Sequence, residues 1–522
     1  MTGTVSGLIT QQAADRPAAV YALSADGTQQ MRFGELLQDC QYLQAAWQRL
    51  GLQAGDTVSL VLPNGLQTLR LLLGGLYAGL VVNPVNMLSQ PEQMRYVLEH
   101  SDCKLVLAAP DWAERVQAIL DSLPRRVTLV VLAPDGDAAA LVSALASTSE
   151  SALEPLFDSA LPAAQQSHAW AAPQPEATAL LMYTSGTTGV PKGVMLTQAN
   201  LAANAHAIST EHALSPQDRV LAVLPLYHIN AFAVTMLAPL AHGGSLAMPA
   251  RFSSAQFWAE ATSLHCTWLN VVPTMISYLL EGPSPPRQTL QGVRFCRSAS
   301  SALAPDHHRA FESKFGIGII ETMGLTETVA PSFSNPLQPS LRKVGSVGRA
   351  SGGEARVMDG SRQPVPDGIT GEIDIRGPHV MRGYYKNESA TAAAFTADGW
   401  LRTGDLGHRD SDGFFFITGR IKELIIKGGE NIAPREIDEA VGLHPSVLEA
   451  AAVGIPDRHY GQEIMVCVVL REGMRCDEEM LRLHCIAALG RYKTPKVIRF
   501  LSTLPRGPSG KVQRLKLLDA TT

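Results

Sequence analysis

The stretch Thr184-Ser185-Gly186-Thr187-Thr188-Gly189-Val190-Pro191-Lys192-Gly193 organises the prediction of the fold. An apolar run over residues 179–183 precedes it, as expected of a buried strand. Residues 194–196 are apolar again, and Thr197 then suits the N-cap of a helix. Glycines let backbone N–H groups approach a phosphate, hydroxyl groups donate hydrogen bonds, and Lys192 adds a positive charge. The stretch therefore predicts an anion-binding loop between a strand and a helix, although a plain flexible turn has a similar composition.

Length, charge and cysteine content bound the class of protein. The chain has 522 residues, too many for one compact core, so we expect more than one domain. Its net charge of −5 gives no basic field for nucleic acid. The seven cysteines form no Cys-x-x-Cys pair, which argues against a zinc site or a disulfide framework and suits a reducing compartment such as the cytoplasm.

The sequence predicts neither a signal peptide nor an integral membrane segment. The N-terminal residues lack a basic region followed by a hydrophobic core. The most apolar long window, residues 220–239, is interrupted by Pro225, His228 and Asn230. These interruptions favour a buried strand, loop and helix over a membrane span.

Alternating helical and strand patterns over residues 1 to about 110 imply an α/β layer with a mostly parallel sheet. After the glycine-rich stretch, further apolar runs end in polar or small residues near positions 228, 273, 298 and 327. Because ligands of open α/β sheets bind outside the carboxyl ends of strands, these ends are expected to converge on one crevice.

The expected fold class is α/β, with a large N-terminal domain over residues 1–420 and a small α+β domain over residues 421–522. Layered α/β sheets make up most of the large domain. From about residue 345, short strands punctuated by glycines predict a β-rich subdomain.

Four further stretches carry candidate chemistry. Gly324-Leu325-Thr326-Glu327 follows a strand and ends in a carboxylate, which suits Mg²⁺, an ion that prefers hard oxygen ligands. Residues 399–405 and 419–423 combine glycines with charged side chains, and Gly510-Lys511 lies in a Pro/Gly/Ser turn near the C-terminus. Taken singly, each is also typical of a solvated surface turn.

Together and in this order, these stretches closely resemble the signatures of the adenylate-forming superfamily, over about residues 10 to 516. That superfamily contains acyl- and aryl-CoA ligases, adenylation domains of peptide synthetases and beetle luciferases. The resemblance implies a reaction in two halves. A carboxylate attacks ATP to give an acyl-adenylate and pyrophosphate, and a thiol then displaces AMP.

The resemblance also implies a nucleotide site. ATP would be held by Thr184, Ser185, Gly186, Thr187, Thr188, Gly189, Lys192, Ser300, Ser301, Ala302, Glu321, Thr322, Met323, Gly324, Thr326, Asp405 and Arg420. Glu327 and Thr187 would bind Mg²⁺, and Asp405 would accept hydrogen bonds from the ribose hydroxyls. The family often carries an aromatic residue where this chain has Met323, whose thioether can still pack on adenine.

By the same resemblance, Lys511 would be the catalytic lysine, because it would stabilise charge on the attacking carboxylate, the α-phosphate and the departing pyrophosphate. The small domain would be mobile and turn about Lys422, presenting Lys511 in one state and the loop at Gly429 in the other. Missing side chains in that loop would leave room for the pantetheine arm of coenzyme A. His228 would line the acyl pocket and gate the thiol tunnel, although a lone histidine among apolar neighbours is as often structural.

The acyl pocket is the least specified part of the site. By alignment to the family its residues would be Tyr227, Asn230, Val272, Thr274, Ser298, Ala299, Gly324, Leu325 and Thr328. This set mixes small and polar side chains and contains no evident arginine to pair with a second carboxylate. It favours a short or medium acyl acid, or a compact aryl acid, over a very long chain.

Coenzyme A is the favoured acceptor, because no carrier domain is attached to the chain. The alternative is a free-standing adenylation enzyme that loads a carrier-protein phosphopantetheine. A catalytically silent nucleotide-binding scaffold is a third possibility, and Lys192, Glu327, Asp405 and Lys511 argue against it. The sequence leaves a monomer and a homodimer open.

Overall fold

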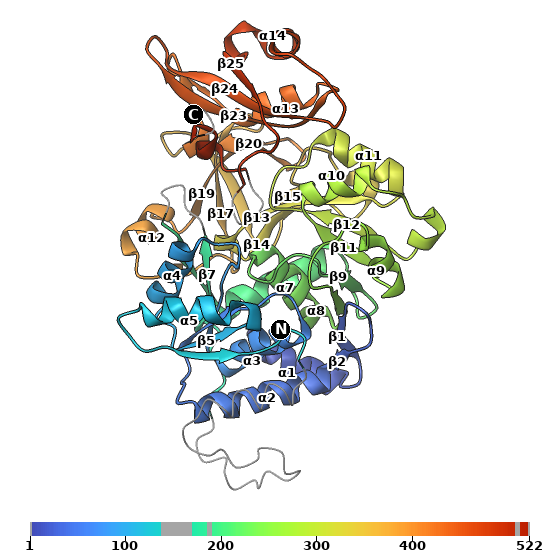
Figure 1. The fold of residues 1–522 in the computed structure, drawn as a ribbon, viewed down its shortest axis with the longest axis vertical. Helices are drawn as coiled ribbons and strands as arrows, with labels where there is room; N and C mark the ends of the chain where they lie inside the picture. The colour runs from blue at the N-terminus through green and yellow to red at the C-terminus, as the bar shows by residue number, and fades with distance from the viewer. Residues whose placement is uncertain (1–2, 137–169, 185–189, 507–511, 520–522) are drawn as a thin grey trace. The chain divides into compact units, whose positions relative to one another are not determined.

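The structure is a computed structural model that describes residues 3–136, 170–184, 190–506 and 512–519. Its contacts divide the chain into two compact units. The first comprises residues 1–354 and 376–401, and the second comprises residues 355–375 and 402–522. The elements of both units are labelled in Figure 1.

The first unit alternates helices and strands along the chain. Its described elements are α1 (Val5–Asp15), β1 (Val20–Ser24), β2 (Gln30–Arg32), α2 (Phe33–Arg49), β3 (Thr57–Val61), α3 (Leu66–Ala78), β4 (Val81–Pro84), α4 (Pro91–His100), β5 (Leu105–Ala108), η1 (Pro110–Trp112), α5 (Ala113–Asp121), β6 (Thr128–Val131), β7 (Thr178–Thr184), β8 (Lys192–Thr197), α7 (Gln198–Glu211), β9 (Arg219–Leu221), η3 (Asn230–Leu237), α8 (Ala238–His242), β10 (Ser245–Met248), α9 (Phe257–Ser263), β11 (Trp268–Val271), α10 (Pro273–Glu281), η4 (Arg287–Leu290), β12 (Phe295–Ser298), α11 (Pro305–Phe315), β13 (Ile319–Leu325), η5 (Thr326–Thr328), β14 (Ala330–Ser334), η6 (Pro339–Leu341), β15 (Arg349–Ala350), β18 (Gly383–Tyr384) and α12 (Glu388–Ala394).

Two mostly parallel sheets form the frame of this unit. One has the strand order β15-β14-β13-β12-β11-β9-β10-β1-β2, and the strands from β13 to β1 are parallel. The other has the order β18-β8-β7-β4-β3-β5-β6, and the strands from β7 to β6 are parallel. The predicted α/β class with layered sheets is confirmed.

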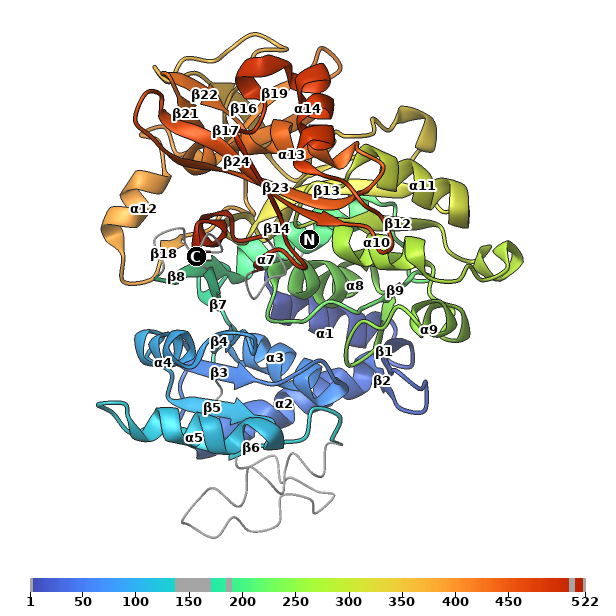
Figure 2. The same cartoon turned by 45° about the horizontal axis from the view of Figure 1, so that its top comes forward.

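The largest apolar core of the first unit lies between the two sheets. It joins side chains of both sheets, such as Leu60 and Trp268, to helical residues such as Leu72 and Phe232. Separate cores cover the outer faces. One packs α9, α10 and α11 on the first sheet, and the other packs α4 and α5 on the second, where Figures 1 and 2 show α5 beside β5. Burial of this apolar surface stabilises the layered arrangement.

The glycine-rich stretch differs from its prediction in one respect. The sequence predicted a loop between a strand and a helix, whereas the stretch connects β7 to β8, a strand antiparallel to β7, before α7 begins. The predicted cap is confirmed, because the Thr197 side chain accepts a hydrogen bond from the Asn200 N–H at 3.1 Å. The run of residues 194–196 is too short for its pattern to reveal a strand.

The second unit contains two antiparallel-rich sheets. Its described elements are β16 (Glu354–Met358), β17 (Gly371–Arg376), β19 (Leu401–Arg409), β20 (Phe415–Arg420), η7 (Ile421–Glu423), β21 (Ile425–Lys427), β22 (Glu430–Ile432), α13 (Pro434–Gly442), β23 (Val447–Asp457), β24 (Gly461–Leu470), α14 (Glu478–Lys493), β25 (Val497–Phe500) and η8 (Arg514–Leu517). The strand orders are β16-β17-β19-β20 and β22-β21-β24-β23, with β25 paired to β24. The contacts thus group residues 355–375 of the predicted β-rich segment with residues 402–522, and the predicted domain boundary between residues 420 and 421 stays a prediction.

No helix of the described residues is long and apolar enough to cross a membrane. The interrupted apolar window contains β9, a loop, the π-helix η3 and the start of α8, and its side chains from Ala231 to Leu237 are buried.

The side chain of Asn64, in the turn after β3, ties the two sheets of the first unit together. Its amide nitrogen donates to the Leu224 carbonyl at 3.0 Å, its oxygen accepts from the Leu226 N–H at 3.0 Å, and only 4% of the residue is exposed. We expect Asn64→Ala to lower the free energy of unfolding by about 2 kcal/mol, because buried backbone groups lose their partners. Denaturant unfolding measures this change.

The matched control is Asn86→Ala, which removes an exposed hydrogen bond to the Leu88 N–H. It should change the free energy of unfolding by less than about 0.5 kcal/mol. Equal effects of the two substitutions would contradict the tie assigned to Asn64.

Candidate active site

The predicted nucleotide loop starts at the carboxyl end of a parallel strand. Thr184 ends β7, Lys192 begins β8, and the two residues are direct partners in the antiparallel ladder. Ser185, Gly186, Thr187, Thr188 and Gly189 lie outside the described residues, so their roles stay predictions. The ladder nevertheless fixes Lys192 directly across from Thr184.

A tyrosine connects Lys192 to the predicted metal ligand Glu327. The Lys192 Nζ lies 4.8 Å from the centre of the Tyr384 ring, and the Tyr384 hydroxyl donates to Glu327 Oε1 at 2.9 Å. Burial, with a smaller contribution from Glu327, raises the pKa of Tyr384, so the hydroxyl keeps its proton and remains a donor. No pattern in the sequence indicates Tyr384, which reaches the site because β18 pairs with β8.

Gly324 allows an unusually close approach of β13 and β14. A Cβ atom at this position would lie 1.7 Å from the Ala330 carbonyl oxygen, and the ladder between the strands shifts register next to Met323. Val329 and Ala330 have φ angles of 55° and 73°, in the left-handed region that costs energy for residues with a side chain. Such strain often accompanies a functional turn, and here it surrounds the turn that carries Glu327.

The polar side chains of this turn are held by local hydrogen bonds. The buried Thr328 hydroxyl donates to the Ala330 carbonyl at 3.0 Å and accepts from the Leu325 N–H at 3.1 Å. Thr326 and Glu327 are half-buried in η5. The turn therefore presents Glu327, while Thr328 serves its internal structure.

The ends of β12 and β13 bring several predicted residues together. Ser298 and Glu321 are buried partners in the parallel ladder, and the Thr322 hydroxyl donates to the Ser298 carbonyl at 3.4 Å. Glu321 Oε1 accepts from the Leu303 N–H at 3.4 Å. Met323, the predicted adenine contact, is half-buried opposite Phe333.

Ser300 links this edge to the π-helix η3. Its φ angle is 75°, and its Oγ accepts a hydrogen bond from the Asn230 side-chain nitrogen at 3.3 Å. Ser301 and Ala302 are exposed. The loop after β12 thus adopts a strained conformation that a side chain from another element supports.

The remaining predicted pocket residues lie on the loop after β9 and at the end of β11. The Tyr227 and His228 rings are in contact, with centroids 4.7 Å apart, and burial raises the pKa of Tyr227 to about 12. Val272 and Thr274 stand at the N-terminus of α10, and the Ala299 N–H donates to the Val271 carbonyl. These segments follow neighbouring strands of one sheet, as expected of a site at their carboxyl ends.

The structure adds an arginine that the predicted pocket lacked. Arg297, on β12, is 1% exposed, and its Nη1 donates to Asn230 Oδ1 at 2.7 Å and to Asn270 Oδ1 at 2.8 Å. Residue type and spacing gave no signal for this contact, because the partners come from η3 and β11.

In the second unit, two predicted ribose contacts are paired with each other. Asp405 and Arg420 are partners in the ladder of β19 and β20, with Arg420 Nε 2.6 Å from Asp405 Oδ1. The Asp405 side chain is only 3% exposed, whereas that of Arg420 is 43% exposed. A partly exposed cation thus sits beside a buried carboxylate.

The predicted hinge and thiol-site residues are also in this unit. Lys422 is exposed in η7. Gly428 and Gly429, with φ angles of 57° and 86°, form the turn between β21 and β22, and a Cβ atom on Gly429 would meet nothing within 4 Å. Lys511 lies outside the described residues, so its catalytic role stays a prediction.

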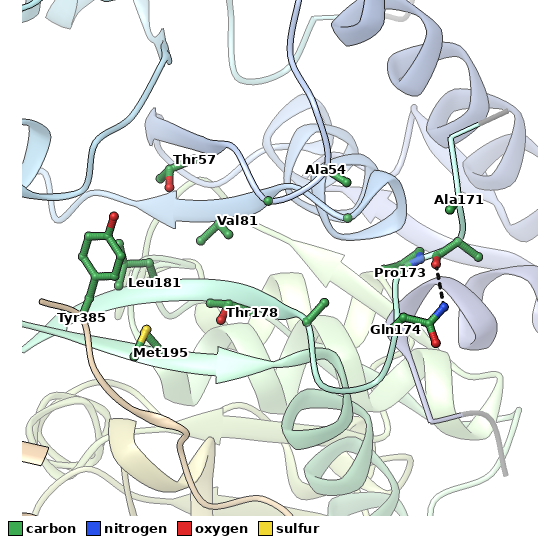
Figure 3. A pocket seen from close by; sticks show the side chains of 14 residues that line it. Ala54, Thr57, Val81, Ala171, Pro173, Gln174, Thr178, Leu181, Met195 and Tyr385 are labelled. Carbon is green, nitrogen blue, oxygen red and sulfur yellow. Dashed lines mark hydrogen bonds between the residues drawn. The ribbon is translucent and has the colours of Figure 1, made fainter. Parts of the chain in front are cut away.

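A groove of about 520 Å³ occurs elsewhere on the first unit (Figure 3). It is lined by Thr57, Val81 and Thr178, at the amino ends of β3, β4 and β7, and by Tyr385. None of the predicted site residues lines it. Because ligands of open α/β sheets bind at the opposite, carboxyl ends, we do not assign the active site to this groove.

The first unit has an α/β fold whose candidate residues stand at the carboxyl ends of its strands, and a second unit contains the C-terminal residues. The family model described as AMP-binding enzyme matches residues 9–385, and that described as AMP-binding enzyme C-terminal domain matches residues 436–511. The chain therefore belongs to the AMP-binding enzyme family.

Three known proteins are similar over most of their length. Sulfoacetate–CoA ligase of Cupriavidus necator is 57% identical over 99% of this chain and 97% of its own. Oxalate–CoA ligase of Arabidopsis thaliana is 35% identical over 89% and 88%. The crystal structure of ATP-bound MatB from Rhodopseudomonas palustris has 30% identity and a TM-score of 0.88, covering 99% of this chain and 98% of that one.

These comparisons confirm the predicted reaction class, an ATP-dependent acid–CoA ligase. They do not favour the alternative of an enzyme that loads a carrier protein, because the similar proteins are CoA ligases. The substrates are accordingly a carboxylic acid, ATP and CoA.

We expect Gly324→Ala to reduce AMP formation by at least about 10-fold and to lower the melting temperature, since an added methyl group forces β14 away from the turn of Glu327. A coupled AMP assay and thermal unfolding measure the two effects. Gly292→Ala is the control, because its Cβ atom would meet nothing within 4 Å. A Gly324→Ala enzyme with wild-type rate and stability would refute the close approach.

Proposed function

We propose that this CoA ligase activates sulfoacetate, or a closely similar short acid that carries a second anionic group. The observation that carries the proposal is the 57% identity to a sulfoacetate–CoA ligase over 99% of the chain. Sulfoacetate has two carbons, with a carboxylate at one end and a sulfonate at the other. The small and polar pocket residues, Asn230, Ser298 and Ala299 among them, suit an acid of this size and charge.

The residues around Glu327 fit a triphosphate with Mg²⁺. Glu327 Oε1 accepts from Tyr384, and Oε2 makes no hydrogen bond or ion pair with a described residue. A half-buried carboxylate oxygen of this kind is a hard ligand that Mg²⁺ prefers. We assign the metal to Glu327 with Thr187, and the phosphates to Lys192 and the loop of residues 184–189. Bound Mg²⁺ would offset phosphate charge during the attack on ATP.

Charge and size suggest roles for the other nucleotide residues. The buried Asp405 would accept hydrogen bonds from the ribose hydroxyls, and the more exposed Arg420 would reach ribose or phosphate. Thr322, Met323 and Gly324 would border adenine, with the Met323 thioether on its face. Ser300, Ser301, Ala302, Glu321 and Thr326 complete the proposed nucleotide contacts.

The two half-reactions would use the second unit differently. In the first, a carboxylate oxygen of the acid attacks the α-phosphorus, pyrophosphate leaves, and Lys511 stabilises the charge that develops between them. In the second, the CoA thiolate attacks the acyl carbon and AMP leaves. Rotation about Lys422 would exchange Lys511 for the Gly428–Gly429 turn, where the open space beside Gly429 suits the pantetheine arm.

The acid itself would lie against the strand ends of the first unit. Its reacting carboxylate would face the nucleotide, and its body would contact Tyr227, Asn230, Val272, Thr274, Ser298, Ala299, Leu325 and Thr328. His228 would border the thiol path. A short pocket at this place would exclude long aliphatic chains by size.

A panel of acids tests the proposed substrate. AMP release and mass spectrometry of the thioester would be measured with sulfoacetate, oxalate, malonate, acetate, propionate and hexanoate. We expect kcat/KM for sulfoacetate to exceed that for acetate and propionate by at least about 100-fold, because a pocket with groups for a second anion rejects acids that lack one. A preference for acetate, propionate or hexanoate would refute the proposal.

Lys511→Ala separates the two half-reactions. We expect adenylate formation, measured by ATP–pyrophosphate exchange, to fall by about 100-fold or more, because charge in the transition state loses its partner. Thioester formation from a supplied acyl-adenylate and CoA should keep its rate. Lys516→Ala, which removes an exposed cation of η8, is the matched control. Equal loss of both half-reactions in the Lys511 variant would contradict the assigned role.

A further inference from the structure

Arg297 is a fully buried cation without a carboxylate partner among the described residues. It is one of the largest side chains with less than 2% exposure. Among the described residues, its side chain donates hydrogen bonds to two asparagines, and no ion pair joins it to an aspartate or glutamate. Buried charges are normally paired, because removal of an ion from water costs much free energy. An unpaired arginine at a predicted pocket therefore needs an explanation.

The contacts of Arg297 define a small cluster with Asn230 and Asn270, which we call the arginine–asparagine cluster. Arg297 Nη1 donates to both side-chain oxygens, and the Asn270 side-chain nitrogen also donates to Asn230 Oδ1 at 3.4 Å. Arg297 Nε is buried and has no hydrogen-bond partner among the described residues. The guanidinium is thus held in place, but not all of its N–H groups have a hydrogen-bond partner among the described residues.

The arrangement orients the Asn230 amide. Its oxygen faces the two donors of the cluster, so its nitrogen points the other way and donates to Ser300 Oγ at 3.3 Å. Ser300 lies in the strained loop after β12, next to exposed residues. The Asn230 amide therefore points its nitrogen away from the buried cation and toward the loop after β12.

The surroundings of the cluster do not neutralise the charge. Arg297 lies on the same face of the sheet as Trp268 and Phe295, and the strands β11 and β12 lie side by side in Figure 1. Side chains alternate along a strand, so Glu321, the ladder partner of Ser298, faces the opposite side. The nearby His212 is buried, and burial followed by the Arg297 charge lowers its pKa to about 3, so it stays neutral.

Burial also lowers the pKa of Arg297 to about 9, because no described carboxylate offsets the desolvation of the guanidinium. A bound anion would reverse this effect. Sulfonates and carboxylates have oxygens that match the fork of an arginine and the N–H groups of an amide.

We propose that the arginine–asparagine cluster is the binding subsite for the second anionic group of the acid. Asn230 presents N–H donors to that group, and Arg297 supplies the balancing positive charge. Asn270 fixes both side chains. This assignment rests on the proposed function, since it names the residues that read the sulfonate, and it makes Arg297 a specificity-determining residue.

The phosphates of ATP are the other anions of the reaction. An experiment can distinguish binding of the acid's second anionic group by the cluster from binding of phosphate. We would measure kcat/KM for sulfoacetate and for propionate, and KM for ATP, in Arg297→Met and Asn230→Asp. Arg297→Met removes the charge at similar length. Asn230→Asp places a carboxylate 2.7 Å from Arg297 Nη1 and so supplies an internal counter-ion that keeps the guanidinium paired.

In both variants we expect kcat/KM for sulfoacetate to fall by about 100-fold or more, mainly through KM, and the sulfoacetate-to-propionate preference to fall by at least about 30-fold. KM for ATP should change by much less. Arg294→Met is the matched control, because Arg294 lies three residues earlier and is paired with Asp218 at 2.6 Å. It should leave the preference between the acids unchanged.

Each other outcome overturns a defined part of the proposal. Equal losses with both acids, or a raised KM for ATP, would make Arg297 a structural or phosphate-binding residue. If Arg297→Met does not fold, Asn230→Asp decides, and a retained preference for sulfoacetate refutes the subsite. If the wild-type enzyme prefers oxalate or malonate, the same comparison is made with that acid, and the proposed substrate alone fails. If it prefers acids with no second charge, the proposed function fails and the subsite fails with it.

Discussion

The position of β8 between β7 and β18 is the constraint on which the proposed nucleotide end of the site depends. Antiparallel pairing with β7 sets Lys192 across from Thr184, and pairing with β18 brings Tyr384 from nearly 200 residues later. Tyr384 then contacts Lys192 with its ring and Glu327 with its hydroxyl. A cation and a carboxylate are thereby held near each other without a direct ion pair. Each remains available to a ligand, which a direct pair would not allow.

The turn that carries the Glu327 carboxylate depends on backbone strain. Gly324 lets β14 pass so close that any side chain would collide with Ala330, and Val329 and Ala330 take up left-handed angles to make the turn. The two hydrogen bonds of the Thr328 hydroxyl offset part of that strain. Strain of this kind persists only where the surrounding fold determines it. Here the two sheets and the core between them provide that support.

Much of this could be predicted from the sequence because the signals are local. Strand patterns predicted the parallel sheets whose carboxyl ends carry the candidate site, and Thr197 was predicted as the helix cap that it forms. The structure differs from the prediction where strand pairing or a side-chain contact depends on residues that are distant in the chain. A three-residue apolar run does not indicate that β8 pairs with β7. The residues next to Tyr384 in the chain do not indicate its partner in η5, and those next to Arg297 do not indicate its partners in η3 and β11. Tertiary pairing, which a pattern of spacing does not encode, supplied these contacts.

Lys192 and Arg297, the two cations of the candidate site, differ in burial, and this difference affects which anion each can bind. Lys192 is half-buried and lies against an aromatic ring, so it can meet a mobile, highly charged triphosphate without a large desolvation cost. Arg297 is already desolvated, and its partners are neutral amides. An anion that reaches this cluster must itself shed water, which favours a small group on a short acid over a phosphate chain. An exposed lysine in the same place would attract any anion, including ATP. In the proposed subsite, burial of the charge would therefore convert a general attraction for anions into a preference for one class of acid.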